Sequence, residues 1–228
     1  MMKALLTALT IMLVISCSLA NGDPLKVKAP SLLLNQYAAD DEPGIQYTVV
    51  NENATVFIQS VGLSNVDNEN ALDASQTMAA FSMTKTLTAI AVLQLVEQNE
   101  IRLDDKVTKY VKHPYDPNIT IRHLLNHTSG IPNPMPLRWA HLAREHDDFD
   151  EQFELDKTLN EHASLDFQPG DRYQYSNIGY WLLGSVIARA SGKTYIQYLS
   201  EHLFQPLNLS ASEIGFNIYD ESNHANGY

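Results

Sequence analysis

Ser82-Met83-Thr84-Lys85 stands at the head of an apolar run, Thr86 to Glu97, which the sequence predicts to be a helix. A serine and a lysine three positions apart share one face of a helix, so the lysine amine lies within reach of the serine hydroxyl. Serine is a good nucleophile only when a neighbouring group removes its proton, and a lysine does so only where its surroundings keep it neutral. The start of a helix also presents free backbone N–H groups and a positive dipole to an oxyanion. We therefore expect Ser82 and Lys85 to form a nucleophile and its base.

One Ser-x-x-Lys motif carries little information by itself. At average composition such a pair arises by chance roughly once in a few hundred residues, and this chain has 228. The interpretation therefore depends on the rest of the sequence.

The composition is that of a globular protein. Hydrophobic residues make up 44% of the chain and charged residues 18%, which argues against disorder, and the length suits one domain or one and a part. The formal net charge of −12 repels phosphate backbones, and no cluster of lysine and arginine offsets it. We therefore exclude nucleic acid as a partner.

The N-terminus reads as a targeting segment. Lys3 precedes a short apolar run, residues 4–15, and Ser18-Leu19-Ala20 resembles a signal-peptidase site, which predicts a signal peptide over residues 1–20. Val14-Ile15-Ser16-Cys17 is similar to a bacterial lipobox, in which case the signal ends at residue 16 and a lipid on Cys17 attaches the protein to a membrane. Both interpretations predict export, to the periplasm or envelope as a lipoprotein or otherwise as a secreted protein. The run is shorter than the roughly 20 residues that span a bilayer.

Metal and cofactor chemistry have little support in the sequence. Cys17 is the only cysteine, which excludes an internal disulfide, a catalytic thiolate and a thiolate metal site. His123 and His127 are spaced i, i+4, but the glutamate of a zinc hydrolase motif is missing between them. We interpret both histidines as structural and expect no metal and no cofactor.

The order of the predicted elements indicates an α+β fold. Residues 21–43 read as a tether and an N-terminal helix, and residues 44–50 and 54–61 as two antiparallel strands joined by a turn. Further helices are expected over residues 121–127, 178–191 and 195–203. Strands first and helices later favour an antiparallel sheet with a helical subdomain.

Two local predictions concern solvent exposure. The helix after Ser82 is expected to be largely buried, with one apolar face formed by Leu87, Ile90, Ala91 and Leu95 and widened by Val92, Leu93 and Val96. Residues 132–171 are expected to be irregular, with a solvated acidic loop that contains Asp147, Asp148, Asp150, Glu151 and Glu154.

A second motif, Tyr175-Ser176-Asn177, follows Ser82 by ninety-three residues. With Ser82-x-x-Lys85 it resembles the serine β-lactamase and penicillin-binding-protein family, in the branch of class C β-lactamases, D-alanyl carboxypeptidases, D-aminopeptidases and esterases. The resemblance runs from about Gly44 to Tyr228. Its flanking segments are Leu103–Val107, His123–Gly130, Phe167–Gly170 and Leu182–Gly184.

The resemblance implies a three-layer β-lactamase-like fold and a role for each motif residue. Ser82 would attack a carbonyl carbon and become the acyl-enzyme, and its backbone N–H would supply half of an oxyanion hole. Lys85 would take or share the proton, Tyr175 would carry it to the leaving group, and Asn177 would bind the substrate amide. Whether Lys85 or Tyr175 is the general base stays open, and so does the small-molecule or peptide substrate: a muropeptide, a β-lactam, a D-amino-acid peptide or an ester.

The family's third motif, Lys-Thr-Gly or His-x-Gly on a strand, is missing from this sequence. Lys193-Thr194 lies between two predicted helices and does not replace it. We therefore interpret residues 44–228 as a partial domain without its C-terminal strands, and expect little or no activity from the 228-residue chain. The alternative is a non-catalytic envelope protein that keeps the pocket and binds without turnover.

Overall fold

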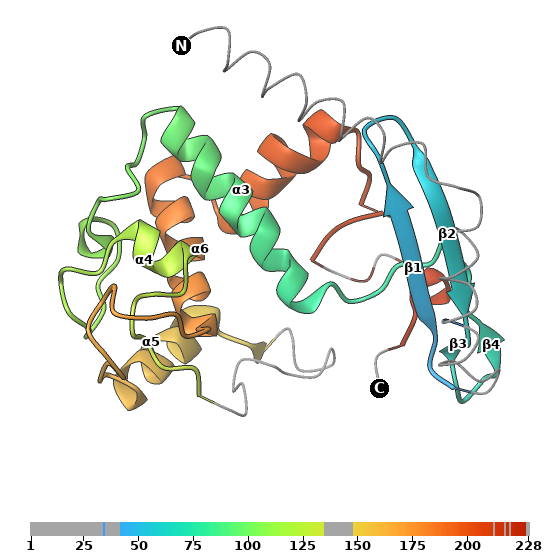
Figure 1. The fold of residues 1–228 in the computed structure, drawn as a ribbon, viewed down its shortest axis with the longest axis horizontal. Helices are drawn as coiled ribbons and strands as arrows, with labels where there is room; N and C mark the ends of the chain where they lie inside the picture. Colours follow the sequence, from blue (N-terminus) through green and yellow to red (C-terminus); the bar gives the residue numbers. More distant parts are fainter. Residues whose placement is uncertain are drawn as a thin grey trace, which may run out of the picture. The chain divides into compact units, whose positions relative to one another are not determined.

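The computed structural model describes residues 34, 42–134, 148–211, 213–216, 218 and 220–226 (Figure 1). These residues separate into two compact units: one holds the described residues up to Ala79 and those from Ile218 onward, and the other holds the described residues of 80–217. The predicted signal peptide, Cys17 and nearly all of the predicted tether and helix at 21–43 lie outside the described residues. Within the described ranges, no helix is both long and apolar enough to cross a membrane.

The first unit contains the predicted β-hairpin. Strand β1 (Ile45–Val50) pairs antiparallel with β2 (Thr55–Val61). The Asn51 side chain stabilises the turn, because its Oδ1 accepts hydrogen bonds of 2.9 Å from the backbone N–H groups two and three residues later. A shorter antiparallel pair follows, formed by β3 (Leu63–Asn65) and β4 (Asn70–Ala71).

The C-terminal segment of the chain joins the same unit. After a 3₁₀ turn at Glu221–Asn223 it runs parallel to the segment around Thr77. The Thr77 N–H donates to the Asn223 carbonyl at 2.9 Å, and the Ala225 N–H donates to the Thr77 carbonyl at 2.8 Å. The Thr77 hydroxyl also lies 2.9 Å from Nδ1 of His224. These bonds join segments that lie 146 residues or more apart in the sequence.

The second unit is helical. A 3₁₀ turn, Phe81–Met83, leads directly into α3 (Thr84–Glu97), as the sequence predicts. The other elements are α4 (Ile121–Leu125), α5 (Glu151–Glu161), α6 (Asn177–Ser191), α7 (Tyr195–Leu199), a π-helical turn at Ser200–Phe204, and 3₁₀ turns at Val107–Lys109 and Gln205–Leu207.

Polar caps explain where three of these helices begin. Thr120, Ser176 and Thr194 precede α4, α6 and α7, and each side chain accepts a hydrogen bond from the backbone N–H three residues later. Gly192 ends α6 with a φ of +70°, the left-handed conformation that glycine adopts without strain. The sequence therefore sets both ends of α6, the helix that begins at Asn177.

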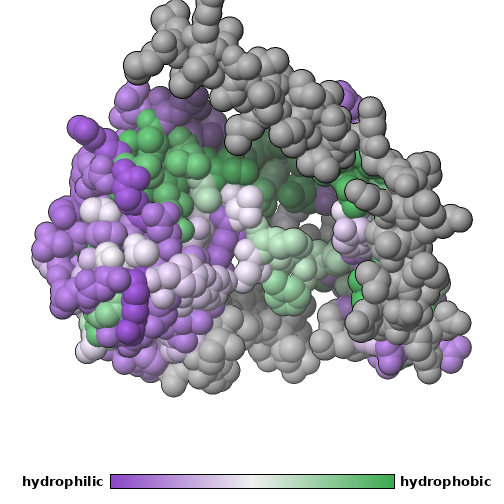
Figure 2. Space-filling model, in the orientation of Figure 1, coloured by the Kyte–Doolittle hydropathy of each residue, from purple (hydrophilic) through white to green (hydrophobic). Residues whose placement is uncertain are grey.

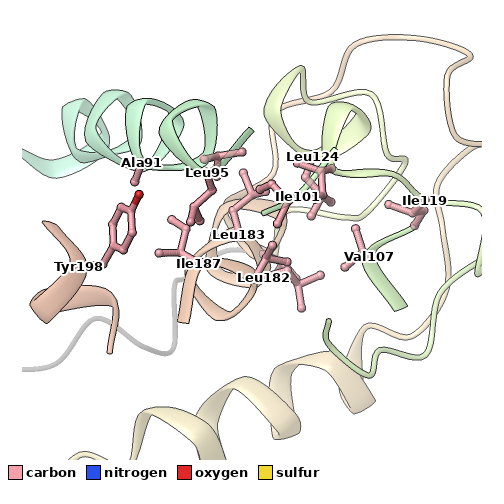
Figure 3. Close-up of a cluster of buried hydrophobic side chains, with 14 of the residues drawn as sticks. Ala91, Leu95, Ile101, Val107, Ile119, Leu124, Leu182, Leu183, Ile187 and Tyr198 are labelled. Atoms are coloured by element: carbon pink, nitrogen blue, oxygen red, sulfur yellow. The ribbon is translucent and has the colours of Figure 1, made fainter. Parts of the chain in front are cut away.

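The core of this unit lies between α3 and α6, with α4 and α7 beside them (Figure 3). Apolar side chains from all four helices and from the connecting segments bury one another there and exclude water. The most deeply buried of them include Ala91, Leu95, Ile101, Val107, Ile119, Leu124, Leu182, Leu183, Ile187 and Tyr198.

The predicted buried face of α3 is wrong in part. Ala91 and Leu95 are buried, but Ile90 is 42% and Leu93 49% exposed, while Thr88 is only 4% exposed. Hydrophobic surface follows α3 in Figure 2 for this reason. Apolar residues lie on every side of this helix, so their spacing does not select a face. Thr88 tolerates burial because its hydroxyl lies 2.7 Å from the Tyr195 hydroxyl.

The predicted acidic loop is a second correction, because part of it forms α5. Asp150 caps this helix by accepting from the Phe153 N–H at 2.9 Å, and Glu151 and Glu154 occupy the first turn, where the helix dipole favours negative charge. Leu155 and Leu159, four residues apart, are buried and fix the helix to the core. Asp148 lies in the described segment just before the cap, and Asp147 lies outside the described residues.

Candidate active site

The candidate nucleophile lies in the 3₁₀ turn just before α3. Phe81, which precedes Ser82, has a φ of +42° and is 80% exposed. A bulky residue in the left-handed region is strained, and such strain is common beside functional groups. The Ser82 N–H belongs to the first turn of the helical segment, where N–H groups lack intrahelical partners. Local structure thus places an exposed hydroxyl at the start of a helical segment, beside the backbone N–H of Ser82 itself.

The structure brings the four predicted site residues together. The Ser82 Oγ lies 2.7 Å from the Tyr175 Oη. The Lys85 Nζ donates to the Ser82 Oγ at 3.3 Å and to the Asn177 Oδ1 at 2.7 Å. The Tyr175 hydroxyl lies 3.4 Å from the same Asn177 oxygen. A serine hydroxyl therefore contacts both a phenol and an amine, the arrangement needed to remove its proton.

Asn133 supports this arrangement, and no sequence pattern predicted its role. The Asn133 Oδ1 accepts from both the backbone N–H and the side-chain Nδ2 of Asn177, at 3.0 and 2.9 Å. The Asn177 amide is thereby oriented with its nitrogen toward Asn133 and its oxygen toward Lys85. Only the folded loop after α4 reveals this contact.

His127 is the second supporting residue that the sequence did not identify. Its ring lies against the rings of Tyr175 and Tyr180, with centroids 4.6 and 4.9 Å away. Its Nδ1 accepts from the Ser176 N–H at 3.2 Å, between the two motif residues. The predicted helix over residues 121–127 ends earlier, at Leu125, and His127 takes a φ of +56°. This conformation turns the ring toward the site.

The charge of Lys85 shapes the titration of its neighbours. Burial raises the pKa of Tyr175, but hydrogen bonds from Lys85 and Ser82 and the charge of Lys85 outweigh it, so the pKa lies below its usual value. Burial and then the charge of Lys85 lower the pKa of His127. The pKa of Tyr180 is raised, chiefly by burial. Tyr175 is thus the tyrosine of this cluster whose ionisation the site favours.

The two predicted structural histidines have structural contacts. The His123 Nδ1 accepts from the Thr120 N–H at 3.2 Å in the capping box of α4, and the His127 Nδ1 is occupied by Ser176. No group of three or more histidine, cysteine or acidic residues suited to a metal occurs among the described residues. Lys193, excluded above as part of a third motif, forms an ion pair with Glu201 at 2.7 Å.

A cavity of about 930 Å³ adjoins the site and extends between α3, α5, α6 and α7. Lys85 and Asn177 line it together with Tyr180. Its other lining residues are Thr84, Thr88, Asp148, Phe149, Asp150, Glu151, Gln152, Leu155, Trp181, Gly184, Ser185, Ala188, Thr194 and Tyr195. The volume is that of a small-molecule site.

Known proteins are similar to this chain in sequence. The Beta-lactamase family model matches residues 33–228. Penicillin-binding protein 4* of Bacillus subtilis (strain 168) is 31% identical over 160 residues, which cover 70% of this chain and 35% of that protein. Protein flp of Staphylococcus aureus (strain MW2) is 29% identical over 195 residues, which cover 82% and 38%. The chain spans little more than a third of the length of these relatives.

Solved structures share the fold. The octameric penicillin-binding protein homologue from Pyrococcus abyssi has a TM-score of 0.66 at 25% identity, covering 89% of this chain and 50% of that one. The penicillin binding protein from Bacillus halodurans has a TM-score of 0.59 at 30% identity, covering 78% and 52%. D-amino acid amidase from Ochrobactrum anthropi SV3, complexed with D-phenylalanine, has a TM-score of 0.67 at 24% identity, covering 82% and 52%.

These matches confirm the α+β fold class, in which a small antiparallel sheet accompanies a helical subdomain. The family match covers most of the chain and includes both motifs and their flanks. The chain belongs to the beta-lactamase family.

Proposed function

We propose that this chain belongs to an exported serine hydrolase that cleaves an amide or ester through an acyl-enzyme on Ser82. The observation that carries the proposal is the position of the Ser82 Oγ, 2.7 Å from the Tyr175 Oη and 3.3 Å from the Lys85 Nζ. Relatives named as penicillin-binding proteins support it. The basis for export is the N-terminal segment alone, either as a signal peptide over residues 1–20 or as a lipoprotein signal that ends before Cys17.

Tyr175 is the general base in this proposal, and Lys85 is the cation that favours its phenolate. Lys85 donates hydrogen bonds to both Ser82 and Asn177, so the serine is left to donate its own proton to the nearer partner, Tyr175. The lowered pKa of Tyr175 agrees with this direction.

In both steps of the proposed reaction, Tyr175 alone carries the proton. The Ser82 Oγ attacks the carbonyl carbon while its proton passes to Tyr175, and the oxyanion forms beside the Ser82 N–H. When the bond to the leaving group breaks, Tyr175 returns the proton to the departing amine or alcohol. A water molecule then repeats the sequence on the acyl-enzyme and releases the acid and free Ser82.

Asn177 has two roles in the proposed reaction. Its oxygen accepts from Lys85, and one of its two amide hydrogens is directed to Asn133. The other amide hydrogen can donate to a carbonyl of the substrate. The substrate class that fits is a small molecule or peptide with an amide, β-lactam or ester bond.

Covalent labelling tests the proposal. In the full-length gene product, a fluorophosphonate or penicillin probe should label the wild type and the Ser222→Ala control, but not Ser82→Ala. Ser222 suits the control because it is an exposed serine of the other unit. Labelling of Ser82→Ala at the wild-type level would overturn the proposal. Labelling without turnover of a reporter ester would favour the non-catalytic binding protein instead.

A further inference from the structure

We propose that the cavity along α6 is a specificity pocket that receives a neutral apolar substituent of the substrate, either aromatic or branched aliphatic. The inference rests on the proposed function, because it assigns the pocket to the substrate that acylates Ser82. It adds a class of substituent to the reaction. Its evidence is the position, shape and chemistry of the lining.

The pocket begins at the candidate catalytic residues. Lys85 and Asn177 belong to its lining, and both also belong to the hydrogen-bonded cluster around Ser82. From Asn177 the lining follows α6 to Ala188. Eleven residues of helix correspond to about 16 Å, so the pocket is long enough for a substituent well beyond a methyl group.

Small residues of α6 make room for that substituent. The wall on α6 consists of Gly184, Ser185 and Ala188. Other walls include Leu155 of α5 and Tyr195 of α7. A Cβ atom added at Gly184 would approach the Tyr195 ring no closer than 3.8 Å, an ordinary contact distance. The space beside Gly184 is therefore open, and larger side chains on this stretch of α6 would fill it.

The polar atoms of the large lining residues already have partners. The Tyr195 hydroxyl lies 2.7 Å from the Thr88 hydroxyl, and the Trp181 Nε1 donates to Glu151 at 2.9 Å. With their polar ends engaged, these two residues offer mainly ring surface to a ligand. Aromatic rings bind apolar and aromatic groups by burial and by stacked or edge contacts.

Lys85 is the one basic residue among the described residues of the lining, and its amine is hydrogen-bonded to Ser82 and Asn177; the other charged lining residues are acidic and disfavour an anionic substituent. Asp148, Asp150 and Glu151 belong to the lining where α5 begins, and all three are exposed. A carboxylate in the pocket would face these like charges after losing water, which is unfavourable. A neutral apolar group meets no such penalty.

A series of p-nitrophenyl esters with one leaving group and different acyl groups, assayed with the full-length gene product, tests the pocket. The wild type should prefer phenylacetate over both acetate and monosuccinate, by at least about 10-fold in kcat/KM, because apolar contacts of this size exceed those of one methylene. Ala188→Phe, which fills part of the pocket, should reduce the ratio of kcat/KM for phenylacetate to that for acetate to about 1. Arg189→Phe is the matched control, because Arg189 is exposed on the same helix and does not line the cavity.

A second variant separates pocket filling from misfolding. Gly184→Ala adds one methyl group to the wall and should stabilise the helix by about 1 kcal/mol. We expect it to lower kcat/KM for phenylacetate while the melting temperature rises, a combination that loss of folding does not produce.

The failures of the two proposals are distinguishable. Hydrolysis that persists in Ser82→Ala would overturn the proposed function. Hydrolysis that depends on Ser82 but shows no preference for phenylacetate would overturn the pocket alone. Equal losses for acetate and phenylacetate in Ala188→Phe would do the same.

Discussion

At the scale of single residues, the site depends on side chains that hold other side chains in place. Asn133 contacts Asn177 through one oxygen that accepts two hydrogen bonds. Asn177 in turn accepts from Lys85. A change at Asn133 should therefore reach Lys85 without any contact between the two.

We expect Asn133→Ala to lower kcat by about 10-fold or more. The Asn177 amide loses the partner that fixes its orientation, and a small misplacement of a group in the active site slows the reaction strongly. Asn133→Asp keeps an oxygen acceptor and should restore most of kcat. Steady-state kinetics on a reporter ester measure both. A loss in Asn133→Asp as large as in Asn133→Ala would contradict an orienting role for the oxygen.

His127 should govern the acid side of the pH profile. Its Nδ1 accepts from the Ser176 N–H, and protonation would place a second N–H against that donor. Burial and the charge of Lys85 lower its pKa, so the neutral ring persists to a pH below about 6.5, the usual value for histidine. We expect kcat/KM to fall only below that pH.

His127→Phe keeps a flat ring beside Tyr175 but removes the acceptor. We expect a lower kcat/KM at neutral pH and an acid limb that moves or disappears. His202→Phe is the control, because His202 stacks on Tyr198 in the π-helical turn. An acid limb unchanged in His127→Phe would show that another group sets it.

The sequence selected residues that the structure brings together but missed those that hold them. Ser82 and Lys85 share a helix start and Tyr175 begins a short motif, so spacing and resemblance suffice to select them. Asn133 and His127 act through one acceptor atom each, and their alignment depends on how the loops after α4 fold back to α6. The spacing of residues along the chain therefore cannot predict these two contacts.

At the scale of elements, α3 shows what periodicity leaves undetermined. The bounds of this helix can be predicted from its composition. Its buried face cannot, because the helix carries apolar residues on every side. The buried side of α3 includes a polar residue, Thr88, whose hydroxyl contacts the Tyr195 hydroxyl. The contact links α3 to α7.

We expect Thr88→Val to lower the free energy of unfolding by about 1–3 kcal/mol, because the Tyr195 hydroxyl loses its partner in a mostly buried place. Ile90→Ala is the control, and its exposed side chain should cost less than about 0.5 kcal/mol beyond helix propensity. Urea unfolding measures both. In the double variant Thr88→Val with Tyr195→Phe, most of the loss should be recovered, and purely additive effects would contradict the pairing.

At the scale of the whole molecule, the sequence predicts the hairpin, the helices and their order, because these follow from local patterns. Contacts between distant segments are different. The bonds between Thr77 and the segment around His224 join residues 146 positions or more apart, and no local sequence pattern predicts them. Helix α5 was also not predicted, because its acidic first turn is typical of a loop. Its helical structure is explained by Leu155 and Leu159, which pack into the core.

The helical unit also contains three histidines whose pKa values burial lowers, His113, His123 and His127. The unfolded chain therefore binds more protons than the folded one between these lowered values and the ordinary value of about 6.5. The free energy of unfolding should consequently be steady above that pH and fall below it.

His113 offers the sharpest test of this acid sensitivity, because both of its ring nitrogens are buried without a hydrogen-bond partner among the described residues. His113→Phe keeps a ring beside Tyr115, whose ring centroid is 5.8 Å away, and removes the titrating group. We expect it to raise the free energy of unfolding at pH 7 by about 1 kcal/mol, since an unpaired buried polar group is unfavourable. Urea unfolding at pH 7 and pH 5 should show a smaller acid loss than in the wild type. An equal loss in both proteins would mean that His113 titrates alike in the folded and unfolded chain, and that its burial does not contribute to acid unfolding.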